Sequence, residues 1–319
     1  EYWDGNIKWI TPAELNDDTY IITDSVRKIT ELAVKQTGLS PIPKGTVILS
    51  SRAPIGKVAI AGCEMYCNQG FKNLICSEKI DNRYLYWFLK GNTEFLNSLG
   101  RGATFKEISK SIVASIEINV PDLKEQLVVV ENLEKINRII TLRKKELNEL
   151  DNLIRARFVE MFGEPQINPF HWDVVNISEV IGGKVSNGFF AKRDDYSDDG
   201  NVSVLGVANI VNRMYSKVDE LPKTNANNKD IEKFEVKYGD MLFCRSSLVA
   251  EGIGKASIVP EDVQDNVLFE CHVIRLPLNL NKCVPEFIQT LSTMDFFRNQ
   301  VVAQSKTATM TTIGQDGIL

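Results

Sequence analysis

A seven-residue repeat of apolar side chains is the clearest pattern along the chain. It occupies a segment without glycine or proline between Pro121, which suits the first turn of a helix, and Gly163, which suits a helix end. The pattern predicts one long helix with an apolar seam, as in coiled coils. The seam residues expected to pair with another helix are Leu133, Ile136, Ile140, Leu147, Leu150 and Ile154.

The length of this helix indicates that it has a helical partner. About 40 residues at ~1.5 Å each extend over ~60 Å, which exceeds the width of a typical domain. A connector helix packed on its own globular core is the alternative, but it would leave much of so long a seam uncovered. We expect the second long helix to come from another subunit, from another copy, or from a part of the protein outside this sequence.

The two flanks of the helix share an order of short apolar runs. Sliding the first flank onto the second matches Gly5 with Gly200 and Gly45 with Gly239, at intervals of 40 and 39 residues. The loops between the matched segments differ, which is typical of related modules that recognise different targets. The matched segments are residues 5–10 with 200–205, 44–49 with 238–243, 50–52 with 245–247, and 55–60 with 253–258.

The repeat predicts an α/β fold of the α+β type, with two similar domains of short mixed strands and helices on either side of the long helix. Residues 172–199, before Gly200, look domain-like, whereas only four residues precede Gly5. We therefore expect an N-terminal part of the first domain, and a long helix following the second, to lie outside this sequence or to be supplied by a neighbouring chain. Strands are predicted at residues 46–50, 57–61, 72–76, 240–244, 255–259 and 272–276, and domain boundaries give residues 1–120, 121–163 and 164–319.

Composition narrows the class of protein. Of 319 residues, 43% are hydrophobic and 25% charged, and no run of 18 apolar residues or apolar leader occurs, so we expect a cytoplasmic globular protein. The 37 basic and 42 acidic residues give a net charge of −5, so any contact with DNA depends on local patches. Six scattered cysteines and two distant histidines predict reduced thiols and no metal site.

Several motifs accompany the repeat. They are the strand starts Lys44-Gly45 and Tyr238-Gly239, the Ile-Gly-Lys turns at residues 55–57 and 253–255, the Gly102-Ala103-Thr104 turn, the helix entry at residues 121–126 and the helix end at residues 158–163. In this arrangement the whole chain resembles the specificity subunit of a type I restriction-modification enzyme. One departure is Thr307, which stands where the first polar turn has glycine.

The resemblance implies a function without catalysis. Specificity subunits carry two target recognition domains, each followed by a spacer helix, and the two helices pair antiparallel. They read a bipartite sequence in double-stranded DNA and recruit methylation subunits and, in the full enzyme, restriction subunits. We expect no cofactor on this chain, with S-adenosylmethionine and ATP on the partner subunits. The sequence agrees with the expectation that this chain binds no nucleotide cofactor, since it contains no glycine-rich nucleotide loop and no P-loop.

Candidate DNA contacts are polar residues in the predicted loops, because base edges are read by Arg, Lys, Asn, Gln, Ser and Thr side chains. Arg52 and Arg245 both follow a strand and are the expected base readers, whereas Lys57 and Lys255 are expected on phosphate. For any single residue, the alternative is an ordinary solvated side chain or turn former. The first domain contributes Ser50, Ser51, Arg52, Lys57, Asn68, Gln69, Lys72, Arg101, Thr104 and Lys106, and the second contributes Ser186, Asn187, Lys192, Arg193, Arg245, Ser246, Ser247, Lys255, Ser305, Lys306 and Thr307.

Two other classes of protein stay open at this stage. The chain could be the recognition part of a fused methylase-nuclease, which a catalytic domain in the longer gene product would reveal. It could also be a coiled-coil scaffold whose flanks bind proteins, for which the negative net charge is mild support.

Overall fold

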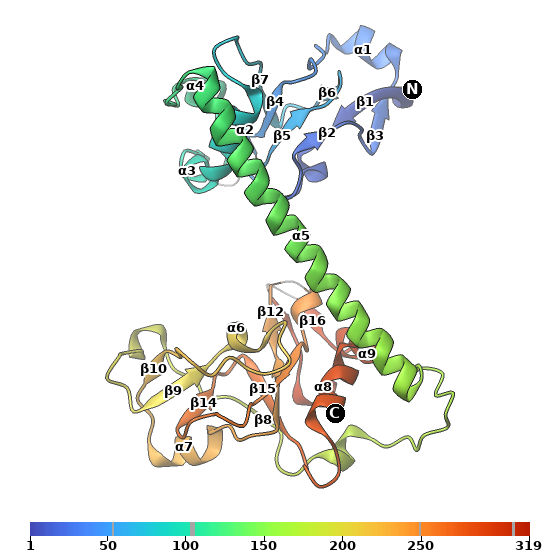
Figure 1. Cartoon of the computed structure of the whole chain (residues 1–319), viewed down its shortest axis with the longest axis vertical. Helices are drawn as coiled ribbons and strands as arrows, with labels where there is room; N and C mark the ends of the chain where they lie inside the picture. The colour runs from blue at the N-terminus through green and yellow to red at the C-terminus, as the bar shows by residue number, and fades with distance from the viewer. Residues whose placement is uncertain (53, 103–105, 249, 308–309) are drawn as a thin grey trace. The chain divides into compact units, whose positions relative to one another are not determined.

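The computed structural model describes residues 1–52, 54–102, 106–248, 250–307 and 310–319, which form two compact units. The first unit covers residues 1–146 and the second covers residues 147–319. The long helix is present as α5 (Leu123–Phe162), whose first part belongs to one unit and whose last part belongs to the other (Figure 1). The predicted α+β class with a long helix is confirmed, while the domain boundaries at residues 120 and 163 stay a prediction.

The first unit is built on two small sheets. The order of the larger sheet is β2-β5-β4-β7, with β4 antiparallel to β5 and β7, and the order of the smaller is β3-β1-β6. Helix α2 covers the larger sheet, since its Tyr86 and Leu89 pack with Val47 and Leu49 of β4. The elements are β1 (Trp3–Ile10), η1 (Pro12–Glu14), β2 (Ile21–Ile22), β3 (Arg27–Ile29), α1 (Glu31–Thr37), β4 (Val47–Ser50), β5 (Val58–Ala61), β6 (Tyr66–Cys67), β7 (Phe71–Leu74), α2 (Asn82–Gly91), α3 (Thr93–Ser98) and α4 (Lys110–Ala114).

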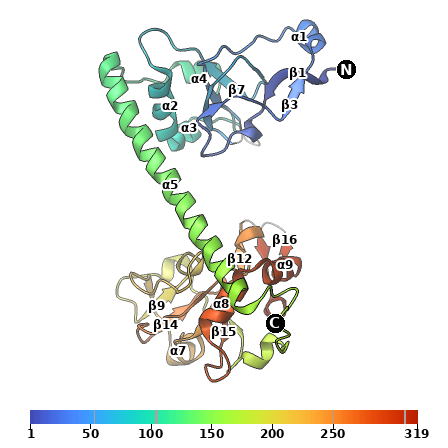
Figure 2. The same ribbon diagram turned by 45° about the vertical axis from the view of Figure 1, so that its right-hand side comes forward.

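The second unit repeats this plan and adds a third sheet. Its sheets have the orders β13-β11-β15-β8, β10-β9-β14 and β12-β17-β16. Figure 2 shows β9 and β14 of the second of these sheets side by side. The core between the first of these sheets and α8 contains Met241, Phe243, Ile258 and Ile288. The elements are η2 (Ile177–Val180), β8 (Ser186–Asn187), η3 (Arg193–Asp195), β9 (Val202–Leu205), α6 (Val207–Ile210), β10 (Lys223–Thr224), α7 (Asn228–Phe234), β11 (Asp240–Cys244), β12 (Ser246–Ser247), η4 (Ala250–Gly252), β13 (Ala256–Ile258), β14 (Val267–Phe269), β15 (Val273–Pro277), α8 (Pro285–Thr293), α9 (Asp295–Ala303), β16 (Lys306–Thr307), β17 (Thr311–Thr312) and η5 (Gln315–Gly317).

The two units repeat each other down to individual backbone hydrogen bonds. In the first, β4 lies between antiparallel β5 and β7, and in the second, β11 lies between antiparallel β13 and β15. In both units a parallel pair follows the matched glycine, β1 with β6 and β9 with β14. The six strands predicted from the apolar runs are therefore confirmed as β4, β5, β7, β11, β13 and β15.

The matched glycines Gly5 and Gly200 have the same structural reason to be glycine. A Cβ atom on Gly5 would lie 2.2 Å from the carbonyl oxygen of Ile29, and one on Gly200 would lie 2.4 Å from the amide nitrogen of Thr224. Both neighbours belong to the strand that pairs antiparallel with the start of the unit, β3 or β10. Only glycine permits this close approach of two backbones.

The sequence match of the Ser/Arg turns is wrong by one residue. Gly56 donates its N–H to the carbonyl of Ser50 at 3.0 Å, and Gly254 donates to the carbonyl of Cys244 at 2.8 Å, so Ser50 corresponds to Cys244. Ser51 therefore corresponds to Arg245, and Arg52 corresponds to Ser246. The error arises because the serines around both turns look alike in sequence, whereas the strand register is set by pairing with other segments.

The start of α5 is fixed to the first unit by a buried glutamine. Gln126 is fully buried, accepts the backbone N–H of Asp81 at 2.9 Å, and donates to the carbonyls of Lys79 and Pro121 at 2.9 and 2.8 Å. One turn further on, the side chain of Val130 is also fully buried. This end of the helix is thus part of the unit's core and not a loose connector.

Changing Gln126 to Leu should destabilise the first unit by about 2 kcal/mol or more. Leucine fills a similar volume but leaves a buried N–H and two carbonyls without a partner, and each such loss costs about 1–3 kcal/mol. Urea unfolding followed by tryptophan fluorescence measures this, because three of the four tryptophans lie in this unit. The exposed Glu131, changed to Leu, is the control and should unfold like the parent chain.

Candidate nucleic-acid interface

Three of the candidate segments of the first unit meet in a short β-ladder. Glu107 pairs with Arg52 on one side and with Arg101 on the other, and both bridges are antiparallel. The amide of Arg101 donates to the carbonyl of Glu107 at 3.0 Å, and that of Glu107 donates back to Arg101 at 2.9 Å. Because residues directly opposite in a ladder point to the same face, Arg52, Glu107 and Arg101 present their side chains together.

Charged hydrogen bonds organise this ladder. The Nε of Arg52 donates to Oε2 of Glu107 at 3.0 Å, and the Nζ of Lys72 donates to Oε1 of the same carboxylate at 3.2 Å. These bonds, first from Lys72 and then from Arg52, hold the pKa of Glu107 below its usual value. Arg101, which lies opposite Glu107 in the ladder, and Lys106, which precedes it in sequence, are exposed. The surface thus carries four cations and one carboxylate, which makes it attractive to an anion such as DNA.

The second unit builds the same ladder with different side chains. In the sheet β12-β17-β16, Thr312 pairs with Ser246 on one side and with Lys306 on the other. Ile313 donates its N–H to the carbonyl of Arg245 just as Ile108 donates to that of Ser51, at 3.0 and 2.9 Å. The face that carries two arginines and a glutamate in the first unit therefore carries a serine, a threonine and a lysine in the second.

Two of the predicted contacts lie inside the first unit, and two others are half-buried in a strand of the second unit. Ser50 and Ser51 are fully buried, and their hydroxyls donate to the carbonyls of Pro54 at 2.7 Å and Gly70 at 3.1 Å. Ser186 and Asn187 form strand β8 and not a surface loop, and Oγ of Ser186 and Oδ1 of Asn187 are buried. The full burial of Ser50 and Ser51 contradicts their assignment as surface contacts, because their hydroxyls bond to backbone carbonyls inside the unit, whereas the assignment of Ser186 and Asn187 stays a prediction.

Several other candidate side chains tie loops together. Lys57 donates to the carbonyl of Leu15, and Lys255, its counterpart, donates to Oδ1 of Asn212 at 2.7 Å. Arg245 is half-buried, with Nη1 on the carbonyl of Cys271 at 3.1 Å. The remaining candidates differ in exposure: Gln69, Lys192, Arg193, Lys306 and Thr307 are exposed, Asn68, Ser247 and Ser305 are half-buried, Ser246 is buried, and Thr104 lies outside the described residues.

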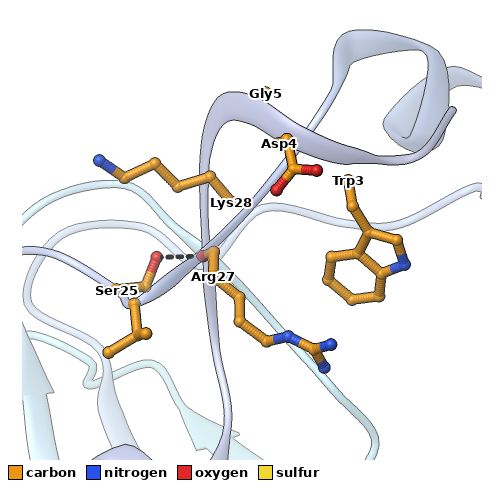
Figure 3. Close-up of a pocket in the computed structure, with 7 residues that line it drawn as sticks. Trp3, Asp4, Gly5, Ser25, Arg27 and Lys28 are labelled. Carbon is orange, nitrogen blue, oxygen red and sulfur yellow. Dashed lines mark hydrogen bonds between the residues drawn. The ribbon is translucent and has the colours of Figure 1, made fainter.

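Sequence reasoning missed two features of this surface. The first is Glu107, which is not among the predicted contacts because phosphate repels a carboxylate. The second feature is a basic pocket between β1 and β3, where the guanidinium of Arg27 lies 4.5 Å from the centre of the Trp3 ring and Lys28 follows it in the strand (Figure 3). Ser25 supports the turn by donating to the carbonyl of Arg27 at 2.6 Å. The adjacent Arg27 and Lys28 at the start of β3 were the available signal in the sequence.

The predicted seam of α5 is largely solvent-exposed in the described chain. Ile136, Ile140, Leu147, Leu150 and Ile154 are between 48% and 64% exposed, and Leu133 is half-buried. Large apolar side chains so exposed in a row mark an interaction surface. In the second unit this surface continues into an apolar groove beside α8, lined by Leu153, Ile154, Arg157, Phe158, Met161, Phe162 and Thr290.

Metal and membrane features can be stated for the described part of the chain. No group of three or more His, Cys, Asp or Glu side chains in it is placed to hold a metal ion. No helix among these residues has the length and apolar character needed to cross a bilayer.

Comparison with known proteins identifies relatives. Residues 1–152 match the family model of the type I restriction modification DNA specificity domain. The type I restriction enzyme MjaIX specificity subunit of Methanocaldococcus jannaschii is 35% identical over 230 residues, which are 66% of this chain and 53% of that protein. The EcoKI specificity subunit of Escherichia coli is 22% identical over 286 residues, 84% of this chain and 59% of that one.

One solved structure is similar to this chain over most of its length. The S subunit of a type I restriction-modification system from M. genitalium has a TM-score of 0.44 and 13% identity, over 95% of this chain and 77% of that one. The chain spans about half the length of the curated relatives that it matches.

Proposed function

Because this chain is similar to the specificity subunits of type I restriction-modification systems, we propose that it is the non-catalytic, DNA-reading subunit of such a system. Each unit reads one half of a bipartite target in double-stranded DNA. The relatives do not favour the two alternatives left open by the sequence, a fused methylase-nuclease and a coiled-coil protein scaffold.

One observation carries the proposal of two half-sites. The units share a backbone framework, yet at equivalent positions of the ladder the first presents Arg52, Glu107 and Arg101 where the second presents Ser246, Thr312 and Lys306. Base pairs are distinguished by the pattern of donors and acceptors that they meet. Identical frames with unlike donors and acceptors are what two different half-sites require.

The proposal includes partner subunits. The exposed seam of α5 pairs with a second long helix, from another copy or from the remainder of the protein, and this pairing fixes the spacing of the half-sites. Methylation subunits, and restriction subunits in the full enzyme, then assemble on it in the cytoplasm. S-adenosylmethionine and ATP are bound by those partners, which supply the chemistry.

The small excess of basic residues in the first unit and the acidic excess in the second predict that the chain alone binds DNA weakly and that its partners strengthen binding. Residues 1–121 carry 14 basic and 13 acidic side chains, and residues 163–319 carry 15 basic and 21 acidic ones, so few counterions are released on binding. The test is selection of duplexes from a random library by the chain alone and by its complex with the methylation subunits. We expect a bipartite motif from the complex and little enrichment from the chain.

Two results would contradict this function. Enrichment of no motif by the complex would exclude sequence reading. Tight, specific binding by the chain alone at physiological salt would show that the ladders suffice without partners, contrary to the charge argument.

A further inference from the structure

Glu107 is a carboxylate at the centre of a surface whose other charged candidate residues are cations. It is 36% exposed, and it lies in the centre of the ladder between the two arginines. Phosphate repels a carboxylate, so in a surface that serves only to attract DNA this residue is unfavourable. The side chains that Glu107 contacts therefore indicate the function of this carboxylate.

The contacts of Glu107 fix the guanidinium of Arg52. The carboxylate engages Arg52 through Nε, at 3.0 Å, and leaves the two terminal nitrogens without a hydrogen-bond partner among the described residues. The second carboxylate oxygen is held by Lys72, at 3.2 Å, and Lys72 in turn donates to the buried hydroxyl of Ser51 at 3.1 Å. A chain of three contacts thus connects the half-exposed arginine to the core of the unit.

We propose that Glu107 is a positioning residue, which orients Arg52 to read a guanine in the first half-site. The inference rests on the proposed function and deepens it by naming the base. Two terminal N–H groups of an arginine match the O6 and N7 acceptors of guanine in the major groove, the commonest specific contact of this kind. An arginine held at Nε presents that fork in one orientation and is kept from the nearest phosphate.

The second unit contains no equivalent arrangement. Thr312 occupies the position of Glu107, Ser246 that of Arg52, and Ile274 that of Lys72, as the strand pairings show. Loss of Glu107 should therefore affect the first half-site alone. This asymmetry separates a positioning role from a general effect on DNA binding.

The test uses the complex with its methylation subunits and the variant Glu107→Gln, which keeps the size of the side chain and the backbone ladder. We expect the preference for guanine at one position of the first half-site to fall at least about tenfold, with the second half unchanged. Binding to random duplex should be unchanged or tighter, and the salt dependence of binding should steepen by about one phosphate contact as Arg52 turns to the backbone. Glu107→Asp, which retains a carboxylate, should lose less preference than Glu107→Gln.

Controls separate the failure modes. Thr312→Ala, at the equivalent position of the second unit, should leave the first half-site intact. An unchanged first half-site in Glu107→Gln would overturn the inference and leave the proposed function standing. Equal losses in both half-sites together with a lower melting temperature would also overturn the inference, because they would indicate a general loss of stability. If the parent complex selects no bipartite motif, the proposed function itself fails. Arg52→Ala should relax the same base position as Glu107→Gln, and a different position would also overturn the inference.

Discussion

Changing Ile140 and Leu147 together to Asp is expected to abolish pairing of the long helix. Both side chains are about half-exposed or more in the described chain, and both lie in the apolar seam of α5. A carboxylate placed in a dry interface loses hydration without gaining a partner, which costs several kcal/mol. For the two changes together we expect at least about 4 kcal/mol, or roughly a thousandfold weaker assembly.

Light scattering of the purified chain and copurification with the methylation subunits measure this loss. The matched control is Thr141→Asp with Asn148→Asp, which adds the same two charges at the next exposed positions of the same helix. The control should assemble like the parent protein, and both variants should keep the melting temperature of their folded units. Normal assembly of the Ile140 and Leu147 variant would mean that the seam faces water in the working protein.

Arg52→Ala is expected to relax one base position of the first half-site by roughly 5- to 150-fold. An arginine on a base edge contributes about 1–3 kcal/mol of discrimination at its own position, whereas one on phosphate weakens binding to all sequences about equally. Arg52 is half-exposed, and its guanidinium is oriented by Glu107. Its removal should therefore change the motif more than the affinity.

The reciprocal variant Lys306→Ala tests the independence of the two units. Lys306 is exposed on the equivalent ladder of the second unit, so its loss should weaken or relax the second half-site only. Lys35→Ala, which removes a highly exposed cation of α1 away from the ladder, is the control for a general charge effect. Motifs are read by sequencing methylation sites of the complex. A uniform loss of activity with an unchanged motif in Arg52→Ala would assign this arginine to phosphate.

The amino-acid sequence alone determined the helix, the repeat and most strands of this protein. These features depend on local physical chemistry: a seven-residue apolar period predicts a helix seam, and short apolar runs beside glycine predict strands. Gly5 and Gly200 could be matched because close approach of two backbones excludes every side chain at both places. The resemblance to the specificity subunits rested on the same order of elements.

Only the tertiary structure decided which side chains reach the surface together. Glu107 and Arg52 are 55 residues apart, and no pattern in the sequence predicts the hydrogen bond between their side chains. The sequence match made Arg52 equivalent to Arg245, whereas the hydrogen-bond pattern within each unit makes Arg52 equivalent to Ser246. A shift of one residue moves a strand side chain to the opposite face of the sheet. Ser50 was expected in a surface loop, yet it is fully buried in β4, which pairs with distant strands, and Asn187 is half-buried in β8, which pairs with β15. Local pattern sets which elements form, whereas long-range register sets what each of them displays.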